Sequence, residues 1–325
     1  MNDVPLVSVL IPCYNHEAFL PDILNSLIAQ TYSNIELLIC DDCSPDRSFA
    51  VIQEFEEKLR SRFPCVEILR NEVNCGVTAN INRMLRLAKG EFIKVIASDD
   101  AMAPDAIGDM VAYFLAHPET DVVIVNGQKV SEDQHYPHFE SKNLIYQQPP
   151  VLSGDDLFRR IAAHNEIFAP GAMLRASVFT CFGLYDESLA VEDLEFWLRL
   201  LRSGQVRFGY VQTPLIYYRI NGGSMTSMEV NATLEKRRAR FHNAILQTYE
   251  VYRDDFANDD FAFLSLTRIL DEMSFAIDRK MDHWVRQLQA QLKAFSPRKE
   301  LSLKNRFLLL RRYVRMQLRK ITKRR

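Results

Sequence analysis

Residues 7–42 decide the fold and read VSVLIPCYNHEAFLPDILNSLIAQTYSNIELLICDD. Two nearly continuous apolar runs, at residues 7–11 and 35–39, have the length of strands that are buried on both faces of a parallel sheet. Between them, apolar residues recur at helical spacing and form one stripe, made of Phe19, Leu20, Ile23, Leu24, Leu27 and Ile28. The stretch therefore predicts strand, helix and strand, the repeating unit of an α/β fold.

The same alternation continues to about residue 130. Further apolar runs of strand length lie at residues 66–69, 92–96 and 122–125. Further helical patterns lie at residues 78–88 and 104–117. A helix after the second strand is predicted to begin with Ser44 as N-cap and Pro45 in its first turn. We predict a doubly wound, Rossmann-like α/β fold with a mostly parallel sheet, helices on both faces and a ligand site at the carboxyl ends of the strands.

The second part of the chain is more varied. Residues 131–150 are polar and hold three prolines and two histidines, which predicts an irregular segment long enough to act as a lid. Helices are then predicted near 155–163 and 193–203, and strands near 171–174, 206–210 and 215–219. Helical patterns dominate from about Met228. We expect an α/β domain at 1–225, with halves at 1–130 and 131–225, and a helical region at 226–325.

Composition narrows the class of protein. The 325 residues are 47% hydrophobic and 25% charged, which is typical of a globular chain and unlike a disordered one. No apolar run approaches the roughly 20 residues of a membrane span. The N-terminus lacks a basic flank before its apolar run, so we expect a core strand and not an export signal. Six scattered cysteines agree with a reducing, cytoplasmic location.

The net charge of −2 hides a strong separation of charge. Residues 298–325 hold twelve Lys or Arg and one acid, a charge of +11, so the remaining 28 basic and 41 acidic residues carry −13. Apolar residues in this tail recur every three or four positions, at Leu303, Phe307, Leu310, Val314, Leu318 and Ile321. The pattern predicts a basic amphipathic helix on an anionic membrane surface. The alternatives are packing on the acidic body and a homodimer contact; no nucleic-acid recognition fold accompanies the charge.

Two pairs of adjacent acids follow predicted strands. Asp41 and Asp42 come after the strand near 35–40, and Asp99 and Asp100 come after the strand near 92–97. At one sheet edge, four carboxylates repel each other unless a cation or hydrogen-bond donors lie between them. Mg²⁺ or Mn²⁺, held by one or two carboxylates, leaves positions for substrate phosphates. The alternative is ordinary turn chemistry, in which Asp caps the next helix.

Four motifs together resemble the family 2 glycosyltransferases with the GT-A fold, of the bacterial surface-polysaccharide type. They are VSVLIPCYNHEAFL at 7–20, LLICDDCSPD at 37–46, NCGVTANINRMLRLAKGEFIKVIASDD at 74–100 and GLYDESLAVEDLEFWLRL at 183–200. The resemblance spans about residues 5–220. It implies an inverting, metal-dependent transfer of one sugar from a nucleotide sugar, most often a UDP-sugar, to a glycan or polyprenyl-linked saccharide.

The resemblance also implies roles for individual residues. Contacts with the nucleotide sugar are implied for Pro12, Tyr14, Asp41, Asp42, Asn74, Asp99 and Arg219. The metal is implied for Asp99, Asp100 and Asn221. In the pair Glu192 and Asp193, the aspartate is implied as the catalytic base. The alternative interpretations are a helix N-cap within the segment that holds Asn74, Gly76 and Asn80, and acids that favour a helix dipole for Glu192 and Asp193.

Two departures from the family pattern keep another function open. Ala97 stands where many relatives have the first acid of the metal motif, and Asn221 stands where many have histidine. A catalytically inactive partner that binds nucleotide sugars is therefore an alternative. A nucleotidyltransferase is a second one, but IPCYNHEAF contains neither the glycine nor the lysine of a phosphate loop. Cys40 and Cys43 have CxxC spacing, yet we interpret them as packed thiols and not zinc ligands.

Overall fold

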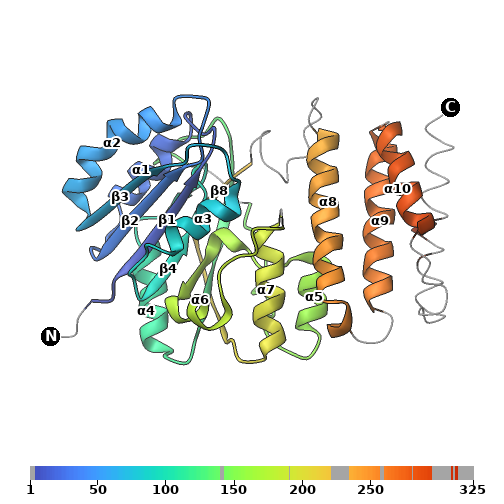
Figure 1. Ribbon diagram of the computed structural model, residues 1–325. Helices are drawn as coiled ribbons and strands as arrows, with labels where there is room; N and C mark the ends of the chain where they lie inside the picture. Colours follow the sequence, from blue (N-terminus) through green and yellow to red (C-terminus); the bar gives the residue numbers. More distant parts are fainter. Residues whose placement is uncertain are drawn as a thin grey trace.

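The computed structural model describes residues 4–139, 143–189, 191–220, 234–256, 260–279, 281–294, 309 and 312–313. In these residues, a mixed eight-stranded sheet has the order β3-β2-β1-β4-β7-β6-β8-β5 (Figure 1). The strands are β1 Val7–Cys13, β2 Ile35–Asp41, β3 Cys65–Arg70, β4 Phe92–Val95, β5 Ala101–Met102, β6 Val122–Ser131, β7 Ala172–Arg175 and β8 Phe208–Ile220. The helices are α1 Leu20–Ile28, α2 Ser48–Arg62, α3 Val77–Leu85, α4 Ala106–Ala116, α5 Leu157–His164, α6 Ala176–Phe182, α7 Glu192–Ser203, α8 Leu234–Val251, α9 Asp260–Asp278 and α10 Asp282–Ala294.

The first four strands form the predicted parallel core. β1 pairs in parallel with β2 and β4, and β2 pairs in parallel with β3. All residues of β2 are buried, which agrees with its unbroken apolar run, whereas β3 at the edge is partly exposed. The register sets Cys13 opposite Asp41, so the carboxyl ends of β1 and β2 lie together.

The structure corrects two local predictions and adds the direction of one strand, which was not predicted. α2 begins at Ser48, and Ser44 is not its cap; the Ser44 hydroxyl instead accepts the N–H of Asn15 at 2.9 Å. The strands predicted at 206–210 and 215–219 are one strand, β8, which pairs in parallel with β6. A register shift in that ladder at Asn126 accommodates the residues between the two runs. The strand predicted near 171–174 is present as β7, but it runs antiparallel to both its neighbours.

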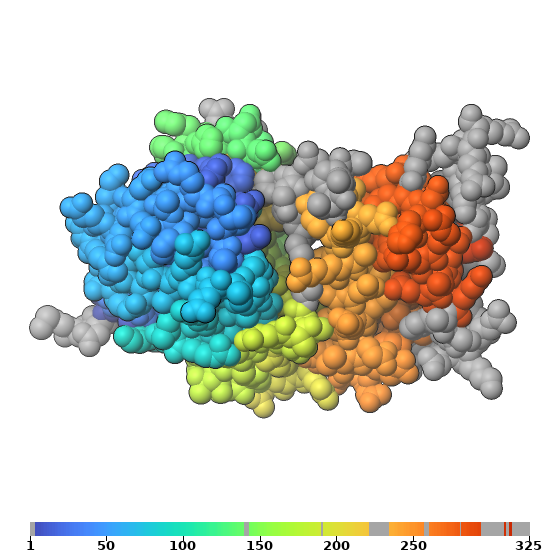
Figure 2. All heavy atoms as spheres, turned by 45° about the horizontal axis from the view of Figure 1, so that its top comes forward, coloured from blue at the N-terminus to red at the C-terminus, as the bar shows by residue number. Residues whose placement is uncertain are grey.

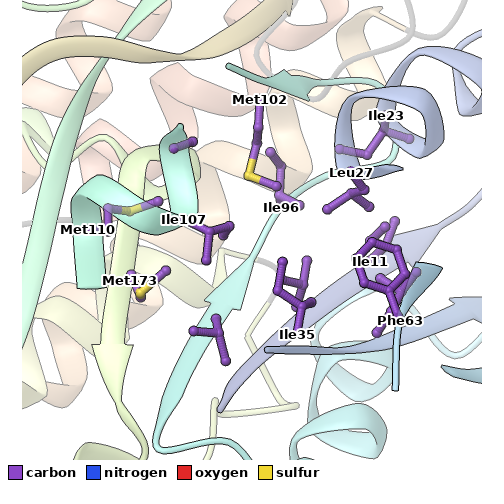
Figure 3. Close-up of a cluster of buried hydrophobic side chains, with 14 of the residues drawn as sticks. Ile11, Ile23, Leu27, Ile35, Phe63, Ile96, Met102, Ile107, Met110 and Met173 are labelled. Atoms are coloured by element: carbon purple, nitrogen blue, oxygen red, sulfur yellow. The ribbon is translucent and has the colours of Figure 1, made fainter. Parts of the chain in front are cut away.

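A separate hydrophobic core lies on each face of the sheet. One core joins alternate residues of β1 and β2 to α1, α2 and α4, and Figure 3 shows part of it. The other joins the opposite face to α3, α5, α6 and α7, and it also includes Tyr249 and Tyr252 at the end of α8. The second core therefore continues from the sheet into the C-terminal helices.

Three C-terminal helices, α8 to α10, form one end of the molecule (Figures 1 and 2). α9 and α10 share a third core, to which Leu309 contributes. Arg312 donates from Nη1 to both carboxylate oxygens of Asp271 in α9, at 2.7 Å. Most of the predicted basic tail lies outside the described residues. Within the described part of the chain, no helix has the length and apolar character needed to cross a membrane.

Candidate active site

Asp42 anchors the loops at the end of β2. Its buried carboxylate accepts hydrogen bonds from the backbone N–H groups of Cys75 and Gly76, at 2.9 and 2.8 Å, and from the Asn71 side chain at 2.7 Å. Gly76 has φ 87°, in the left-handed region that favours glycine, directly before α3. Burial disfavours the charged carboxylate, but these donors outweigh burial and lower the pKa of Asp42. An ionised Asp42 therefore fastens the end of β2 to the start of α3.

Asp41, next to this anchor, is only partly satisfied. Its side chain is buried, and Oδ2 accepts the N–H of Ser44 at 3.1 Å and lies 3.3 Å from Nε of Arg70. Its Oδ1 is buried without a hydrogen-bond partner among the described residues. The Asp42 N–H donates to the Cys13 carbonyl at 2.8 Å, which holds the end of β1 against the end of β2. An unfilled acceptor thus lies where these two strands end.

Asp99 and Asp100 follow β4 and have different surroundings. Asp100 is buried; its Oδ1 accepts the backbone N–H of Arg219 at 2.9 Å, while its Oδ2 has no hydrogen-bond partner in the described chain. Burial, together with the charge of Asp99, raises the pKa of Asp100 well above its ordinary value. Asp99 is less deeply buried, and its Oδ2 lies 3.9 Å from Nε2 of His16. Asp99 is therefore the more accessible member of the pair.

His16 is held firmly beside Asp99. Its Nδ1 lies 2.8 Å from the Ser98 hydroxyl, and its backbone N–H donates to the Ser48 hydroxyl at 2.9 Å. The ring also packs edge-on against Phe19, with centroids 5.8 Å apart. An imidazole thus lies next to the shortened metal motif that has Ala97 at its first position.

Arg219 connects several segments around Asp99. Its guanidinium is fully buried, donates from Nε to the Asp99 carbonyl at 2.8 Å and pairs through Nη2 with Asp22 of α1 at 2.7 Å. Its Nη1 donates to carbonyl groups at the end of β6 and in the turn after it, which belong to Ser131, Glu132 and Gln134. Asp22 in turn accepts the backbone N–H of Tyr136 at 3.0 Å. This buried pair joins α1, the Asp99 turn, β8 and the segment after β6.

Glu192 and Asp193 open α7. The Asn165 amide donates to Asp193 Oδ2 at 3.0 Å, and the Leu194 N–H donates to Oδ1 at 2.7 Å. Burial raises the pKa of Glu192 to about 7, and the neighbouring Asp193 charge adds to the shift. Burial also raises the pKa of Asp193, although the Asn165 and Leu194 donors oppose it. We infer that Asp193 ionises first and that Glu192 keeps its proton until near neutral pH.

Asn165 orients the Asp193 carboxylate from the end of α5. It has φ 44° and ψ 57°, a left-handed conformation that asparagine adopts more readily than most residues. Its Oδ1 is buried without a hydrogen-bond partner among the described residues. A polar residue in a left-handed conformation beside a half-buried carboxylate with a raised pKa is typical of a functional site.

The segment before α7 is tied to α3. Asn82 of α3 donates from Nδ2 to the Tyr185 carbonyl and to Oε1 of Glu187, both at 2.9 Å, and its own Oδ1 accepts the Tyr185 N–H at 3.1 Å. Asp42 holds the start of the same helix through Gly76. The strand-end acids, by which we mean Asp41, Asp42, Asp99 and Asp100, are thus connected through α3 to the helix acids Glu192 and Asp193.

The structure shows where three of the four remaining predicted site residues lie. Pro12 lies in β1 opposite Cys40 of β2, and Tyr14 just after the strand is 47% exposed. Asn74 is exposed, and the N-cap of α3 is Gly76, so the N-cap alternative for this segment holds at Gly76 and not at Asn74. Asn221 lies outside the described residues.

Several residues that build the site were not singled out by the sequence. Asn165, Asp22, Asn71, Asn82 and His16 each reach the site from a different part of the chain. Three are asparagines in unremarkable sequence contexts, and their partners lie far away along the chain. The one local signal was His16, which lies within the YNHEAF stretch after the first strand.

A divalent cation would find few protein ligands here. Among the described residues, no group of three or more His, Cys, Asp or Glu side chains is arranged to hold a metal ion. Asp99 and the unfilled Oδ2 of Asp100 remain as carboxylate oxygens at the end of β4. One or two carboxylates suit Mg²⁺, which keeps its other positions for water and phosphate oxygens. These two residues fit a cation that a substrate diphosphate also binds.

Comparison with known proteins identifies the family. The sequence profile described as Glycosyl transferase family 2 matches residues 8–181, more than half of the chain. The chain belongs to glycosyltransferase family 2. The match contains the strand-end acids and stops before the helix acids, and it confirms the predicted enzyme class. Individual relatives are also similar in sequence to this family 2 chain.

Two relatives illustrate this similarity. EpsH of Bacillus subtilis (strain 168), a candidate glycosyltransferase by its name, is 32% identical over 269 residues, which cover 78% of this chain and 74% of the relative. WcaA of Escherichia coli (strain K12), named as a candidate colanic acid biosynthesis glycosyl transferase, is 26% identical over 265 residues, or 79% of this chain and 84% of the relative.

Solved structures confirm the GT-A fold. Residues 1–349 of TarS from S. aureus, in complex with UDP-GlcNAc, superpose with a TM-score of 0.64 at 19% identity, covering 97% of this chain and 89% of that 1–349 chain. The mannosyltransferase PcManGT from Pyrobaculum calidifontis, in complex with GDP-Man and Mn²⁺, gives a TM-score of 0.58 at 16% identity, covering 98% of this chain and 86% of that chain. At such identities the likeness establishes the fold alone.

Proposed function

We propose that this family 2 glycosyltransferase is an inverting enzyme that moves one sugar from a UDP-sugar to a glycan or lipid-linked acceptor. The observation that carries the proposal is the carboxylate pair at the start of α7. Burial raises the pKa of Glu192 to about 7 and also raises that of Asp193, while Asn165 orients the Asp193 carboxylate. A base with a raised pKa and a fixed orientation is what removal of a hydroxyl proton requires.

In the proposed step, Asp193 accepts the proton of the acceptor hydroxyl. The hydroxyl oxygen forms a bond to the anomeric carbon, and the bond between that carbon and the diphosphate oxygen breaks on the opposite face. The leaving nucleoside diphosphate takes the electron pair, so the configuration at the anomeric carbon inverts. Below about pH 7, Glu192 keeps its proton, so Asp193 carries the single negative charge of the pair. Asp193 then returns its proton to solvent.

Mg²⁺ or Mn²⁺, when bound, would supply positive charge that stabilises the departing diphosphate. Asp99 and Asp100 are the residues that would hold it, with Asn221 as a further candidate from the sequence. His16 stands beside Asp99, 3.9 Å from its carboxylate, and holds that side of the turn together with Ser98. Support for a cation in this fold comes from PcManGT, whose structure contains GDP-Man and Mn²⁺.

Contacts with the nucleotide remain proposals for residues at the ends of β1 and β2. Asp41 has a buried oxygen without a hydrogen-bond partner in the part of the chain that the structure describes, and Tyr14 has an exposed ring that could cover a base. Pro12, Asp42 and Asn74 are further candidates from the family resemblance. Arg219 has a full set of protein partners, which supports a role in holding the Asp99 turn more than a direct contact with substrate.

We propose that the product belongs to surface polysaccharide biosynthesis. WcaA is named for colanic acid, and TarS was solved with UDP-GlcNAc, which supports this reaction class and a nucleotide-sugar substrate. We further propose a glycosyltransferase domain at 1–225 and a helical region at 226–325. The basic tail would bring the enzyme to the inner face of the cytoplasmic membrane. The Arg312–Asp271 contact supports the alternative in which part of the tail packs on α9.

A panel of nucleotide sugars tests the reaction. The full chain would be incubated with UDP-glucose, UDP-galactose, UDP-GlcNAc and GDP-mannose, each with Mn²⁺ or with EDTA, and followed by release of nucleoside diphosphate and by thermal stability. We expect one UDP-sugar to raise the Tm and to be hydrolysed only with Mn²⁺, because ligand that binds the folded state stabilises it. Stabilisation without turnover would support the inactive binding partner. No response to any compound would contradict the proposed function.

A further inference from the structure

The C-terminal helix α8 contacts both structural elements that hold the helix acids. In Figure 1, α8 stands beside α7 and α5. The Tyr249 hydroxyl donates to the Ala162 carbonyl of α5 at 2.6 Å, and the Tyr252 hydroxyl donates to Oε1 of Glu195 in α7 at 2.7 Å. One end of one helix thus places a hydrogen-bond donor on each element.

These two tyrosines lie on the same side of the C-terminal end of α8. Tyr249 lies in its last turn, and the N–H of Tyr252 continues the turn by donating to the Thr248 carbonyl at 3.2 Å. Residues three apart on a helix are neighbours on its surface. Both side chains are buried, with 2% and 3% of their surface exposed, so their hydroxyl groups depend on these protein acceptors.

The contact with α5 lies next to Asn165. Ala162 is three residues before Asn165, and the Asn165 N–H closes the last turn of α5 by donating to the Ile161 carbonyl at 2.7 Å. The Asn165 side chain then reaches Asp193 at 3.0 Å. A shift of the last turn of α5 would therefore move the amide that orients the carboxylate.

The contact with α7 lies within the first turn after Asp193. Glu195 is buried and binds Arg199 through both of its oxygens, at 3.1 and 2.6 Å. Arg199 also donates to the carbonyl groups of Phe182 and Leu184, at 2.8 and 2.7 Å, in the segment that leads to α7. Tyr252 thus completes a buried network that sets the position of the first turn of α7.

We propose that Tyr249 in the last turn of α8 and Tyr252 directly after this helix are positioning residues for Asp193, so that the C-terminal helices complete the active site. The inference rests on the proposed function, because it takes Asp193 as the base. Neither tyrosine touches the reacting atoms. Each acts through a neighbour, Tyr249 through α5 and Asn165, and Tyr252 through Glu195 and the first turn of α7.

Conservative variants of the full chain test this role. Tyr249→Phe, Tyr252→Phe and the double variant keep the rings and remove only the hydroxyl groups. Tyr210→Phe is the matched control, because the Tyr210 hydroxyl is also buried but has no hydrogen-bond partner among the described residues. Amide hydrogen exchange of residues 157–166 and 192–199 would be measured for each. We expect it to be at least about tenfold faster in the double variant, as local opening becomes easier, and unchanged in the control.

Kinetics separates positioning from general stability. With the most active member of the nucleotide-sugar panel, we expect the double variant to lose about tenfold in kcat while KM for that compound changes less than about twofold, because misplacement of a catalytic group slows the chemical step. We also expect the acid limb of its kcat profile to move to higher pH, since the Asn165 donor that favours the charged Asp193 is loosened. Exchange or a pH profile equal to that of Tyr210→Phe would overturn the inference.

The results that would contradict the proposed function differ from those that would contradict the role of the two tyrosines. Full turnover by Asp193→Asn would remove Asp193 from the base role whatever the tyrosine variants do. Loss of turnover by Asp193→Asn, together with a double tyrosine variant that behaves as the control, would leave the proposed function intact and overturn only the role of α8.

Discussion

Asp42 at the end of β2 and the helix acids at the start of α7 are carboxylates of the candidate site with opposite electrostatic surroundings. Asp42 accepts two backbone N–H groups and an amide, and its pKa is lowered. Glu192 and Asp193 lie side by side with fewer donors, and the pKa of each is raised. The number of hydrogen-bond donors around a buried carboxylate thus decides whether it serves as a permanent anchor or as a group that exchanges protons.

The largest effect is expected at Asp193. Asp193→Asn keeps the shape and the Asn165 contact but removes the base, so kcat should fall by about 10²- to 10⁴-fold. Thermal stabilisation by the active nucleotide sugar should remain as in the wild type. Asp186→Asn, in the exposed turn before α7, is the control and should keep most activity. A variant at position 193 with wild-type kcat would contradict the contrast between Asp42 as an anchor and the helix acids as groups that exchange protons.

Asp22→Asn should have the next largest effect, and on stability. The variant leaves the guanidinium of Arg219 fully buried without its charged partner, which typically costs about 3–5 kcal/mol of unfolding free energy. Chemical denaturation of the two proteins would measure the difference. Asp109→Asn, on the exposed face of α4, is the control and should change stability little. If Asp22→Asn loses no more unfolding free energy than Asp109→Asn, the pair of Asp22 and Arg219 does not hold the Asp99 turn.

Asp42→Asn should show the cost of losing a charged anchor. The amide has one acceptor oxygen, so the Gly76 N–H loses its partner, and about 1–3 kcal/mol of stability should be lost at pH 7. Because the folded pKa of Asp42 lies below its ordinary value of 3.8, its contribution is present above pH 3.8 and disappears as the pH falls through the folded value. Wild type and variant should therefore converge in acid; parallel stability curves would contradict this.

The smallest effect is expected from Glu192→Gln, as a change in how stability depends on pH. Asp193 ionises while Glu192 still holds its proton, so exchanging one neutral group for another should leave the acid limb of kcat near its wild-type position. The folded wild type binds an extra proton between pH 4.5 and about 7, so its unfolding free energy should fall as pH rises through that window. The variant should lack that slope. A variant that keeps the slope would show that Glu192 does not hold the extra proton.

Much of the parallel core was predictable because its signals are local. The runs at 7–11 and 35–39 form β1 and β2, and the apolar stripe between them forms α1. The antiparallel direction of β7 and the single long β8 were not predictable, since strand direction and a register shift depend on neighbours far away in the sequence. Ser44 failed as a helix cap for a similar reason, because its hydroxyl is used by Asn15 of another segment.

The site shows the same division. The acids stood out as pairs after strands and in the family motifs, and the structure gives each pair a distinct environment. Asn165 could not be found from the sequence, because an asparagine in a turn has no pattern that names a partner 28 residues away. Asp22 likewise appears as one polar position on α1 until its pairing with Arg219, 197 residues later, is known.

The sequence alone determined the strand-helix alternation, the family and the identity of the carboxylates, because each of these is written in short stretches of residue types. Only the tertiary structure decided what the carboxylates do. Ionisation depends on burial and on the number of donors within hydrogen-bond distance, and those donors come from Asn71, Gly76, Asn165 and Leu194 in three separate segments. The joining of α8 to the helix acids is likewise a product of packing, since the hydroxyl groups of two buried tyrosines acquire a role only beside α5 and α7.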